Sequence, residues 1–234
     1  MDIRKAIPNT ITSMNLLCGV MGVIFTFKDR PDIAFCLMLA AAAFDFLDGL
    51  AARALGAYSD IGKELDSLCD VVSFGVLPAL MLHCTMVSQA GETVWCYVPL
   101  LLAVFSALRL AKFNIDERQH ASFLGLPTPA AAMICGALCC FAFAEPGTAP
   151  ARFCATAWGL PLLAVLLSAL LVCELPMFAM KFGKGIETDK RTRSRRFMFL
   201  GLAVLSIILT AVFDLHWSLV FLGTFVGYIL VNLI

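Results

Sequence analysis

The residues best suited to chemistry are four aspartates that stand at helical spacing on either side of a short turn. Before the turn, residues at i, i+3, i+4, i+7 and i+8 mark one face of a predicted helix, namely Asp45, Asp48, Gly49, Ala52 and Arg53. After it, residues at i, i+4 and i+8 mark one face of a second helix, namely Gly62, Asp66 and Asp70. The segment between them, 54–61, contains turn residues, so we expect an antiparallel pair whose carboxylates converge.

Apolar sequence surrounds these carboxylates. The segments 34–44 and 71–82 contain no charged residue, and an acid at membrane depth costs about 3 kcal/mol on insertion scales. Acids in such a place are paired, bind a cation or line an ion path. Gly49 and Gly62 lack a Cβ and let a ligand approach the backbone, and Arg53 is suited to a phosphate oxygen. Because hard cations take oxygen ligands, the set predicts Mg²⁺ or Mn²⁺ holding a pyrophosphate.

The pattern D-x2-D-G-x2-A-R-x8-G-x3-D-x3-D runs from Asp45 to Asp70 with all eight fixed positions in register. It resembles the signature of the CDP-alcohol phosphotransferases, which are integral membrane enzymes of phospholipid synthesis. The resemblance implies a six-helix membrane core and the transfer of a phosphatidyl group from CDP-diacylglycerol to an alcohol, with CMP as the leaving group.

The resemblance also implies a role for each matching residue. Asp45, Asp48 and Asp66 would hold one Mg²⁺ or Mn²⁺ ion, and Asp45, Asp66 and Asp70 a second, so that each site holds two. Asp70 would also be the general base for the acceptor hydroxyl. The residues that bind CDP-diacylglycerol would be Asn9, Thr12, Gly49, Arg53, Ser59 and Gly62.

The sequence P-N-x-x-T at Pro8–Thr12 opens the first apolar segment. From the residues alone, Asn9 and Thr12 fit helix capping after a proline as well as they fit ligand binding. In the family this element contacts the cytidine part of the donor, so the resemblance favours binding.

Three further strings resemble the phosphatidylserine synthase branch of the family, which implies L-serine as the acceptor. They are D-S-x-x-D-x-V-S-F-G-V-x-P-A at 66–79, R-L-A-K-F-N at 109–114 and G-L-P-T-P-A-A-A at 125–132. Arg109 and Lys112 share a helix face at i and i+3, and we expect them to bind the serine carboxylate. The other interpretation of this pair is a basic anchor at the cytoplasmic membrane surface.

The composition is that of an integral membrane protein. Hydrophobic residues make up 61% of the 234 residues and charged residues only 15%, against about 25% charged in soluble domains. The formal net charge is zero, so nothing indicates a nucleic-acid partner. The ten cysteines lie mostly in apolar runs and show no disulfide spacing, which favours small hydrophobic side chains over a disulfide framework.

About eight apolar segments approach the length of about 20 residues needed to cross a bilayer. They are 8–27, 33–55, 66–88, 94–113, 126–145, 154–180, 197–214 and 217–234. We therefore predict an all-α, polytopic bundle of about eight transmembrane helices. Its domains would be the family core at 1–196 and a C-terminal transmembrane hairpin at 197–234.

The basic residues predict the orientation of the chain. With a cytoplasmic N-terminus and eight crossings, only Lys28, Arg30 and Arg152 of the 17 Lys and Arg lie on the far side. The four aspartates then face the cytoplasm, where nucleotide-linked substrates are found. The basic segment 181–196 would contact anionic lipid headgroups. The family resemblance implies a homodimer.

Three alternatives stay open. The acceptor alcohol could be glycerol 3-phosphate or an inositol phosphate instead of serine, since Arg109 and Lys112 also suit a phosphate. An ion-coupled transporter would use intramembrane acids, but it predicts polar residues spread along several helices. A structural membrane scaffold would leave the aspartate signature unexplained.

Overall fold

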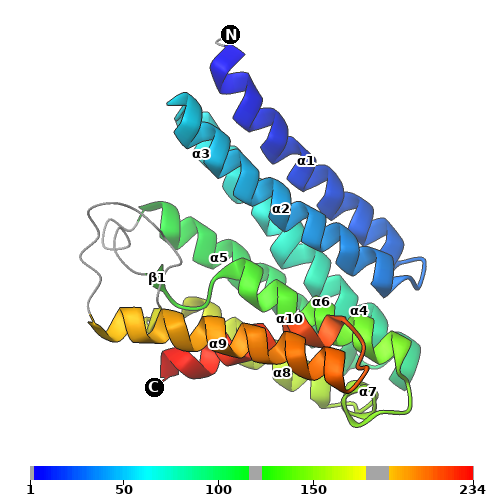
Figure 1. Ribbon diagram of the computed structural model, residues 1–234. Helices are drawn as coiled ribbons and strands as arrows, with labels where there is room; N and C mark the ends of the chain where they lie inside the picture. The colour runs from blue at the N-terminus through cyan, green and yellow to red at the C-terminus, as the bar shows by residue number, and fades with distance from the viewer. Residues whose placement is uncertain (1–2, 116–122, 178–189, 234) are drawn as a thin grey trace.

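The computed structural model describes residues 3–115, 123–177 and 190–233, which form a bundle of helices (Figure 1). The chain up to residue 115 forms α1 (Ile3–Thr26), α2 (Pro31–Leu55), α3 (Asp60–Asp70), the π-helical turn η1 (Val71–Val76), α4 (Leu77–Ala90), the 3₁₀ helix η2 (Val94–Leu100) and α5 (Leu101–Ile115). The later segments form β1 (Phe123–Leu124), α6 (Thr128–Ala144), α7 (Ala149–Cys154), α8 (Gly159–Val172), β2 (Pro176–Met177), α9 (Lys190–Val212) and α10 (Ser218–Leu233).

The predicted helical membrane fold is confirmed. Five helical runs in the described part of the chain are long and apolar enough to cross a membrane: Ala6–Thr26, Pro31–Leu55, Asp60–Ala90, Val94–Ile115 and Arg193–Val212. Three shorter apolar helices, α6, α8 and α10, bring the set to the eight segments that the sequence predicts. Within the described residues, the strands are β1 and β2, an antiparallel pair of two residues each.

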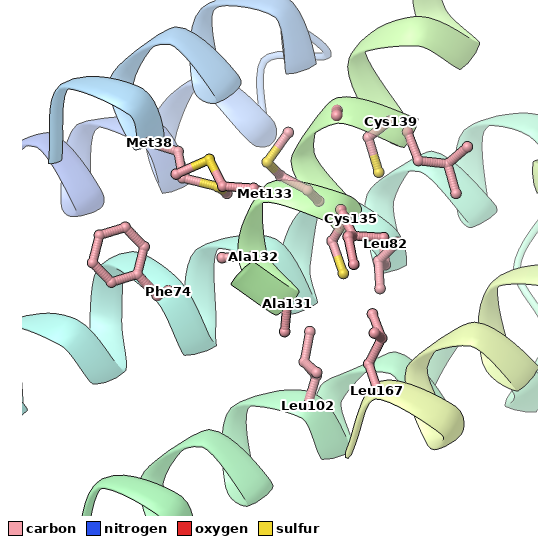
Figure 2. Close-up of a cluster of buried hydrophobic side chains, with 14 of the residues drawn as sticks. Met38, Phe74, Leu82, Leu102, Ala131, Ala132, Met133, Cys135, Cys139 and Leu167 are labelled. Atoms are coloured by element: carbon pink, nitrogen blue, oxygen red, sulfur yellow. The ribbon is translucent and has the colours of Figure 1, made fainter. Parts of the chain in front are cut away.

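Helix α6 lies at the centre of the bundle. Nearly every residue from Thr128 to Ala142 is buried, and α2, α4, α7 and α10 all pack against it. Figure 2 shows side chains of α2, η1, α4, α5 and α8 converging on this helix. Its small residues allow that close approach: at Gly136, a Cβ would lie 2.5 Å from the Phe35 ring.

The turn between α2 and α3 forms as its residues predict. Gly56 ends α2 at φ 58°, a left-handed conformation that glycine adopts without strain, and its N–H bonds back to the carbonyls of Ala52 and Arg53. Ser59 then caps α3, because its Oγ accepts a hydrogen bond from the Gly62 N–H at 3.0 Å. Both helices pack against α1, which holds their marked faces toward each other.

The run from Asp60 to Ala90 continues past Pro78 through a change of helical pitch. The Leu77 N–H bonds to the carbonyl of Val72, which is the wider spacing of the π-helical turn η1. Pro78 falls in the first turn of α4, directly after the residues where the hydrogen-bond spacing is wider. The proline thus follows a π-helical turn, and it does not interrupt the span.

The apolar segment predicted at 154–180 contains a helix, α8, that is shorter than the segment, whose last three residues lie outside the described part of the chain. Helix α7 ends at Cys154, and α8 begins only at Gly159, whose N–H bonds to Thr156 Oγ1 at 3.0 Å. Helix α8 ends at Val172, and the chain becomes extended before Pro176. Cys173 is already extended, and Pro176 restricts Leu175 to extended conformations as well, so the apolar run continues past the end of the helix.

Candidate active site

Three of the four aspartates form a compact cluster between α2 and α3. One carboxylate oxygen each from Asp45, Asp48 and Asp66 lies within 4.8 Å of the other two. Asp48 is buried, and the other two are half-buried. The predicted convergence of carboxylates from two helices is therefore present in the structure.

Asp70 lies one helical turn further along α3 and is only 8% exposed. Its carboxylate is within electrostatic range of Asp45, Asp66 and Asp48. Asn15, on α1, donates a hydrogen bond from Nδ2 to Asp70 Oδ1 at 3.1 Å. Asp70 thus completes the cluster on the side that faces the interior of the bundle.

The surroundings of the carboxylates in the structure fit a divalent cation. Among the described residues, no Lys or Arg forms an ion pair with Asp45, Asp48 or Asp66. Asp48 Oδ2 and Asp66 Oδ1 are buried without a hydrogen-bond partner in the described structure. Two unit charges 4 Å apart interact by about 4 kcal/mol at an effective dielectric of about 20. A hard cation would relieve that repulsion and use the unpaired oxygens as ligands.

An open cleft of about 210 Å³ lies beside the cluster, between α1, α2 and α3. Five of the six predicted donor-binding residues line it, namely Asn9, Thr12, Gly49, Ser59 and Gly62. Asp48 and Asp66 also line it, so the cleft and the carboxylates form one continuous site. The sixth residue, Arg53, is exposed, and its guanidinium nitrogens lie 3.8 Å from where a Cβ on Gly49 would be.

The two glycines of the signature serve different spatial needs. At Gly62, a Cβ would lie 3.1 Å from Asn9 Oδ1 and 3.0 Å from Ser59 Oγ, so two other residues of the cleft meet over it. At Gly49, the Arg53 guanidinium alone comes within 4 Å. Gly62 is therefore the tighter position, and a side chain there would displace predicted donor contacts.

The predicted serine ligands, Arg109 and Lys112, lie in different surroundings. Arg109 is buried, donates from Nη1 to Thr128 Oγ1 at 3.1 Å and is within electrostatic range of Asp70 and Tyr228. Lys112 is half-buried, and its Nζ lies 3.2 Å from Glu174 Oε1. The structure thus places Arg109 within electrostatic range of Asp70 and pairs Lys112 with the acid that follows α8.

Three polar residues near the site were not predicted from the sequence to act there: Asn15, Thr128 and Tyr228. Asn15 had a usable signal, because Asn9, Thr12 and Asn15 stand at i, i+3 and i+6 on one face of α1. Thr128 opens α6 in a string that resembles the synthase branch. Tyr228, on α10, has no local signal, since only the packing of α10 on α6 brings it near Arg109.

Comparison with known proteins gives consistent relatives. Curated proteins named CDP-diacylglycerol–serine O-phosphatidyltransferase share 41% identity over 136 residues in Mycobacterium leprae, 35% over 127 residues in Bacillus subtilis and 36% over 140 residues in Methanocaldococcus jannaschii. These alignments cover 55%, 54% and 59% of this chain, and 45%, 71% and 63% of the respective relatives. The chain thus spans about half the length of the mycobacterial protein it matches.

The family comparison covers more of the chain. The sequence profile of the CDP-alcohol phosphatidyltransferase family matches residues 5–171, from α1 to the last turn of α8. That range contains all four aspartates, the donor cleft and Arg109, while α9 and α10 follow it. The signature, the helical membrane fold and the profile agree, and the chain belongs to the CDP-alcohol phosphatidyltransferase family.

Proposed function

We propose that the protein transfers the phosphatidyl group of CDP-diacylglycerol to the hydroxyl of L-serine, giving phosphatidylserine and CMP. The observation that carries this proposal is the aspartate cluster, which forms one wall of a cleft lined by Asn9, Thr12, Ser59 and Gly62. The names of the relatives support serine as the acceptor.

The cation sites follow from the cluster and the family signature. Asp45, Asp48 and Asp66 would hold one Mg²⁺ or Mn²⁺ ion, and Asp45, Asp66 and Asp70 a second. When bound, such ions neutralise the pyrophosphate and stabilise the charge that develops on departing CMP. The unpaired oxygens of Asp48 and Asp66 support this assignment.

The donor would lie with its nucleotide in the cleft and its acyl chains in the bilayer. Asn9, Thr12 and Ser59 offer hydrogen-bonding groups, and Gly49 and Gly62 leave room for the pyrophosphate against the backbone. Arg53, exposed above Gly49, can reach a phosphate oxygen. The headgroup then reaches the aspartates without the lipid tails leaving the membrane.

The transfer step forms one bond and breaks another. The serine hydroxyl oxygen attacks phosphorus, the bond from phosphorus to the bridging oxygen of CMP breaks, and CMP leaves with that electron pair. The hydroxyl proton passes to the Asp70 carboxylate. A carboxylate is a weak base for an alcohol, so Asp70 acts by its position, accepting the proton as the new bond forms.

Arg109 would bind the serine carboxylate, because it is a buried basic side chain within electrostatic range of Asp70. Lys112 lies one helical turn further along α5, and its partner Glu174 adds the opposite charge. L-serine is a zwitterion, so a site with both signs of charge suits it, whereas Glu174 would repel an acceptor that carries only phosphate. This charge pattern favours serine over glycerol 3-phosphate or an inositol phosphate.

We also propose that the site faces the cytoplasm, that the N-terminus lies on the same side and that the protein is a homodimer. The contact of Lys63 Nζ with the Asn114 carbonyl at 2.9 Å supports a common membrane level for the start of α3 and the end of α5. The excess of Lys and Arg predicted for that side supports the orientation. The homodimer rests on the family alone.

The acceptor assignment is tested with purified protein in detergent, CDP-diacylglycerol and a divalent cation. Labelled serine, glycerol 3-phosphate and inositol 1-phosphate are offered in parallel, and label is followed into lipid. We expect lipid label from serine alone. Label from a phosphate-bearing acceptor would overturn the serine assignment and keep the catalytic one.

A further inference from the structure

Asn15, on α1, contacts the carboxylate of Asp70. It is fully buried in α1, and its Nδ2 donates to Asp70 Oδ1 at 3.1 Å across 55 residues of sequence. No other side-chain hydrogen bond to the Asp70 carboxylate is present among the described residues. One oxygen of Asp70 is therefore held by a fixed donor, and the other is left for the site.

The same residue is held firmly by its surroundings. The backbone carbonyl of Asn15 accepts a hydrogen bond from Ser73 Oγ at 3.1 Å. Ser73 lies so close to Gly19 that a Cβ there would collide with its Oγ. Two contacts, one from the side chain and one from the backbone of Asn15, thus join α1 to the junction between α3 and η1.

Asn15 also has an oxygen that the fold does not use. Its Oδ1 is buried and has no hydrogen-bond partner in the described structure. Fully buried amides in proteins normally satisfy both ends, and an exception in a native structure calls for an explanation such as a catalytic role. A leucine here would remove this unpaired oxygen but would leave Asp70 Oδ1 without its donor, so the bond to Asp70 is what explains the asparagine.

We propose that Asn15 is a positioning residue for Asp70. Its hydrogen bond fixes the rotation of the Asp70 carboxylate, so that the second oxygen faces Asp45 and Asp66, where it can hold a cation and accept the serine proton. This inference rests on the proposed function for its meaning in catalysis. The geometric part, an asparagine that orients a ligand carboxylate, stands by itself.

The first test compares Asn15→Leu with Thr26→Val. Thr26 is a matched control, because it is also buried in α1 and donates a hydrogen bond, to the Gly22 carbonyl at 2.9 Å, far from the aspartates. Loss of a residue that orients a metal ligand lowers metal affinity or activity by about 10- to 100-fold. We expect at least a tenfold loss of kcat and of Mn²⁺ affinity in Asn15→Leu, with the KM for CDP-diacylglycerol unchanged and Thr26→Val like wild type.

Direct Mn²⁺ binding, measured by electron paramagnetic resonance without substrates, makes the test independent of the acceptor. It also separates the two proposals. If the wild type transfers no serine, the proposed function is refuted, and the Mn²⁺ affinities of the wild type and Asn15→Leu still test the role of Asn15. Asn15→Ala serves as a second variant in case the leucine prevents folding, and thermal melting in detergent verifies the fold of each.

A double-mutant cycle with Asp70→Asn shows whether Asn15 acts through Asp70. We expect Asn15→Leu to lower Mn²⁺ affinity in the wild-type background and to change nothing further in Asp70→Asn. Equal losses in both backgrounds would overturn the proposal, as would unchanged Mn²⁺ affinity and kcat in folded Asn15→Leu. An equal loss in Thr26→Val would overturn it as well.

Discussion

Gly62 shows how one missing side chain shapes the donor cleft. Asn9 from α1 and Ser59 from the α2–α3 turn meet above it, with side-chain oxygens 3.1 Å and 3.0 Å from where a Cβ would lie. The signature glycine is thus a contact point between two elements, and its role goes beyond giving a ligand access to the backbone.

We expect Gly62→Ala to raise the KM for CDP-diacylglycerol about tenfold, because the new Cβ pushes Asn9 and Ser59 away from the nucleotide at a cost of about 1.4 kcal/mol. Gly201→Ala is the control, since Gly201 lies in α9 and a Cβ added there would have nothing within 4 Å. Steady-state kinetics at saturating serine measures both. An unchanged donor KM in Gly62→Ala would show that the nucleotide binds elsewhere.

Substitutions of Arg109 and Lys112 compare a buried basic side chain with one that lies nearer the surface. A hydrogen bond to a charged group contributes about 1.5–3 kcal/mol, so we expect Arg109→Ala to raise the KM for serine by at least about tenfold. Lys112→Ala should have a smaller effect, because its ammonium is already paired with Glu174 at the surface. If Arg109→Ala weakens donor binding instead, this arginine belongs to the phosphate site.

At the residue scale, the sequence could predict those parts of the site whose residues are close together in the chain. Asp45 and Asp48, like Asp66 and Asp70, share a helix face by spacing alone, and the structure brings both faces together. The neighbours of Arg109 could not be predicted, since Thr128 and Tyr228 reach it only through tertiary packing. The same holds for the pairing of Lys112 with Glu174, which joins α5 to the end of α8.

Among the elements, the link between the start of α6 and the end of α8 depends on Gly125. This residue has φ 78°, and a Cβ would lie 2.6 Å from the Leu171 carbonyl oxygen and 2.8 Å from that of Cys173. The Gly125 N–H bonds to the Leu175 carbonyl at 2.9 Å, beside the β1–β2 pair. This crossing places Glu174 within reach of Lys112.

We expect Gly125→Ala to destabilise the protein more than Gly91→Ala. Both glycines have positive φ, but nothing lies within 4 Å of a Cβ at Gly91. An alanine at positive φ is strained in both variants, and the collision with two carbonyls is added only at Gly125. Thermal melting in detergent measures the difference. Equal melting temperatures would show that the chain around Gly125 shifts to accommodate the Cβ without loss of stability.

Element boundaries were predictable where local residues set them. Gly56 and Ser59 end α2 and start α3 through their own backbone and side-chain bonds. The helix in the segment expected at 154–180 is shorter than predicted, because hydropathy continues across the break between Cys154 and Gly159 and past the end of α8. Hydropathy indicates which residues are stable in a bilayer or a protein core, and it does not indicate where the helical hydrogen bonds end.

For the whole molecule, the bundle has two chemically different ends. The aspartates, Arg53, Lys63 and the Lys112–Glu174 pair lie at one end. The α1–α2 turn with Arg30 lies at the other end, where a separate cavity is lined by Thr26, Asp29 and Ser88. In Figure 1, the N-terminus and the α2–α3 turn lie beside each other, remote from the α1–α2 turn.

The orientation predicts which loops a reporter enzyme can reach. Alkaline phosphatase, which folds only outside the cytoplasm, should be active when inserted at Gly147 or at Asp214, and inactive when fused to the N-terminus. Gly147 suits insertion because it is exposed and has open space around it. Activity of the N-terminal fusion together with inactivity at Gly147 would invert the topology and place the site outside the cytoplasm.

The overall architecture was predictable from hydropathy, but its central helix was not. Eight apolar segments appear in the sequence, and α6 differs from the others only in its small residues, such as Ala131 and Gly136. The packing of α10 on α6 could not be predicted from the family resemblance either, because α10 lies beyond the residues that the family profile matches. Long-range packing among apolar helices is set by shape, which a residue pattern describes poorly.

The most direct measurement of the central claim follows CMP release and serine incorporation together after removal of divalent cations. Purified protein treated with chelator should do neither, and Mg²⁺ or Mn²⁺ should restore both in equal amounts. Asp66→Asn should stay inactive while remaining folded in the membrane, whereas Glu64→Gln, which changes an exposed acid of the same helix, should behave like wild type. Turnover that survives chelation, or near-normal turnover by Asp66→Asn, would contradict the account.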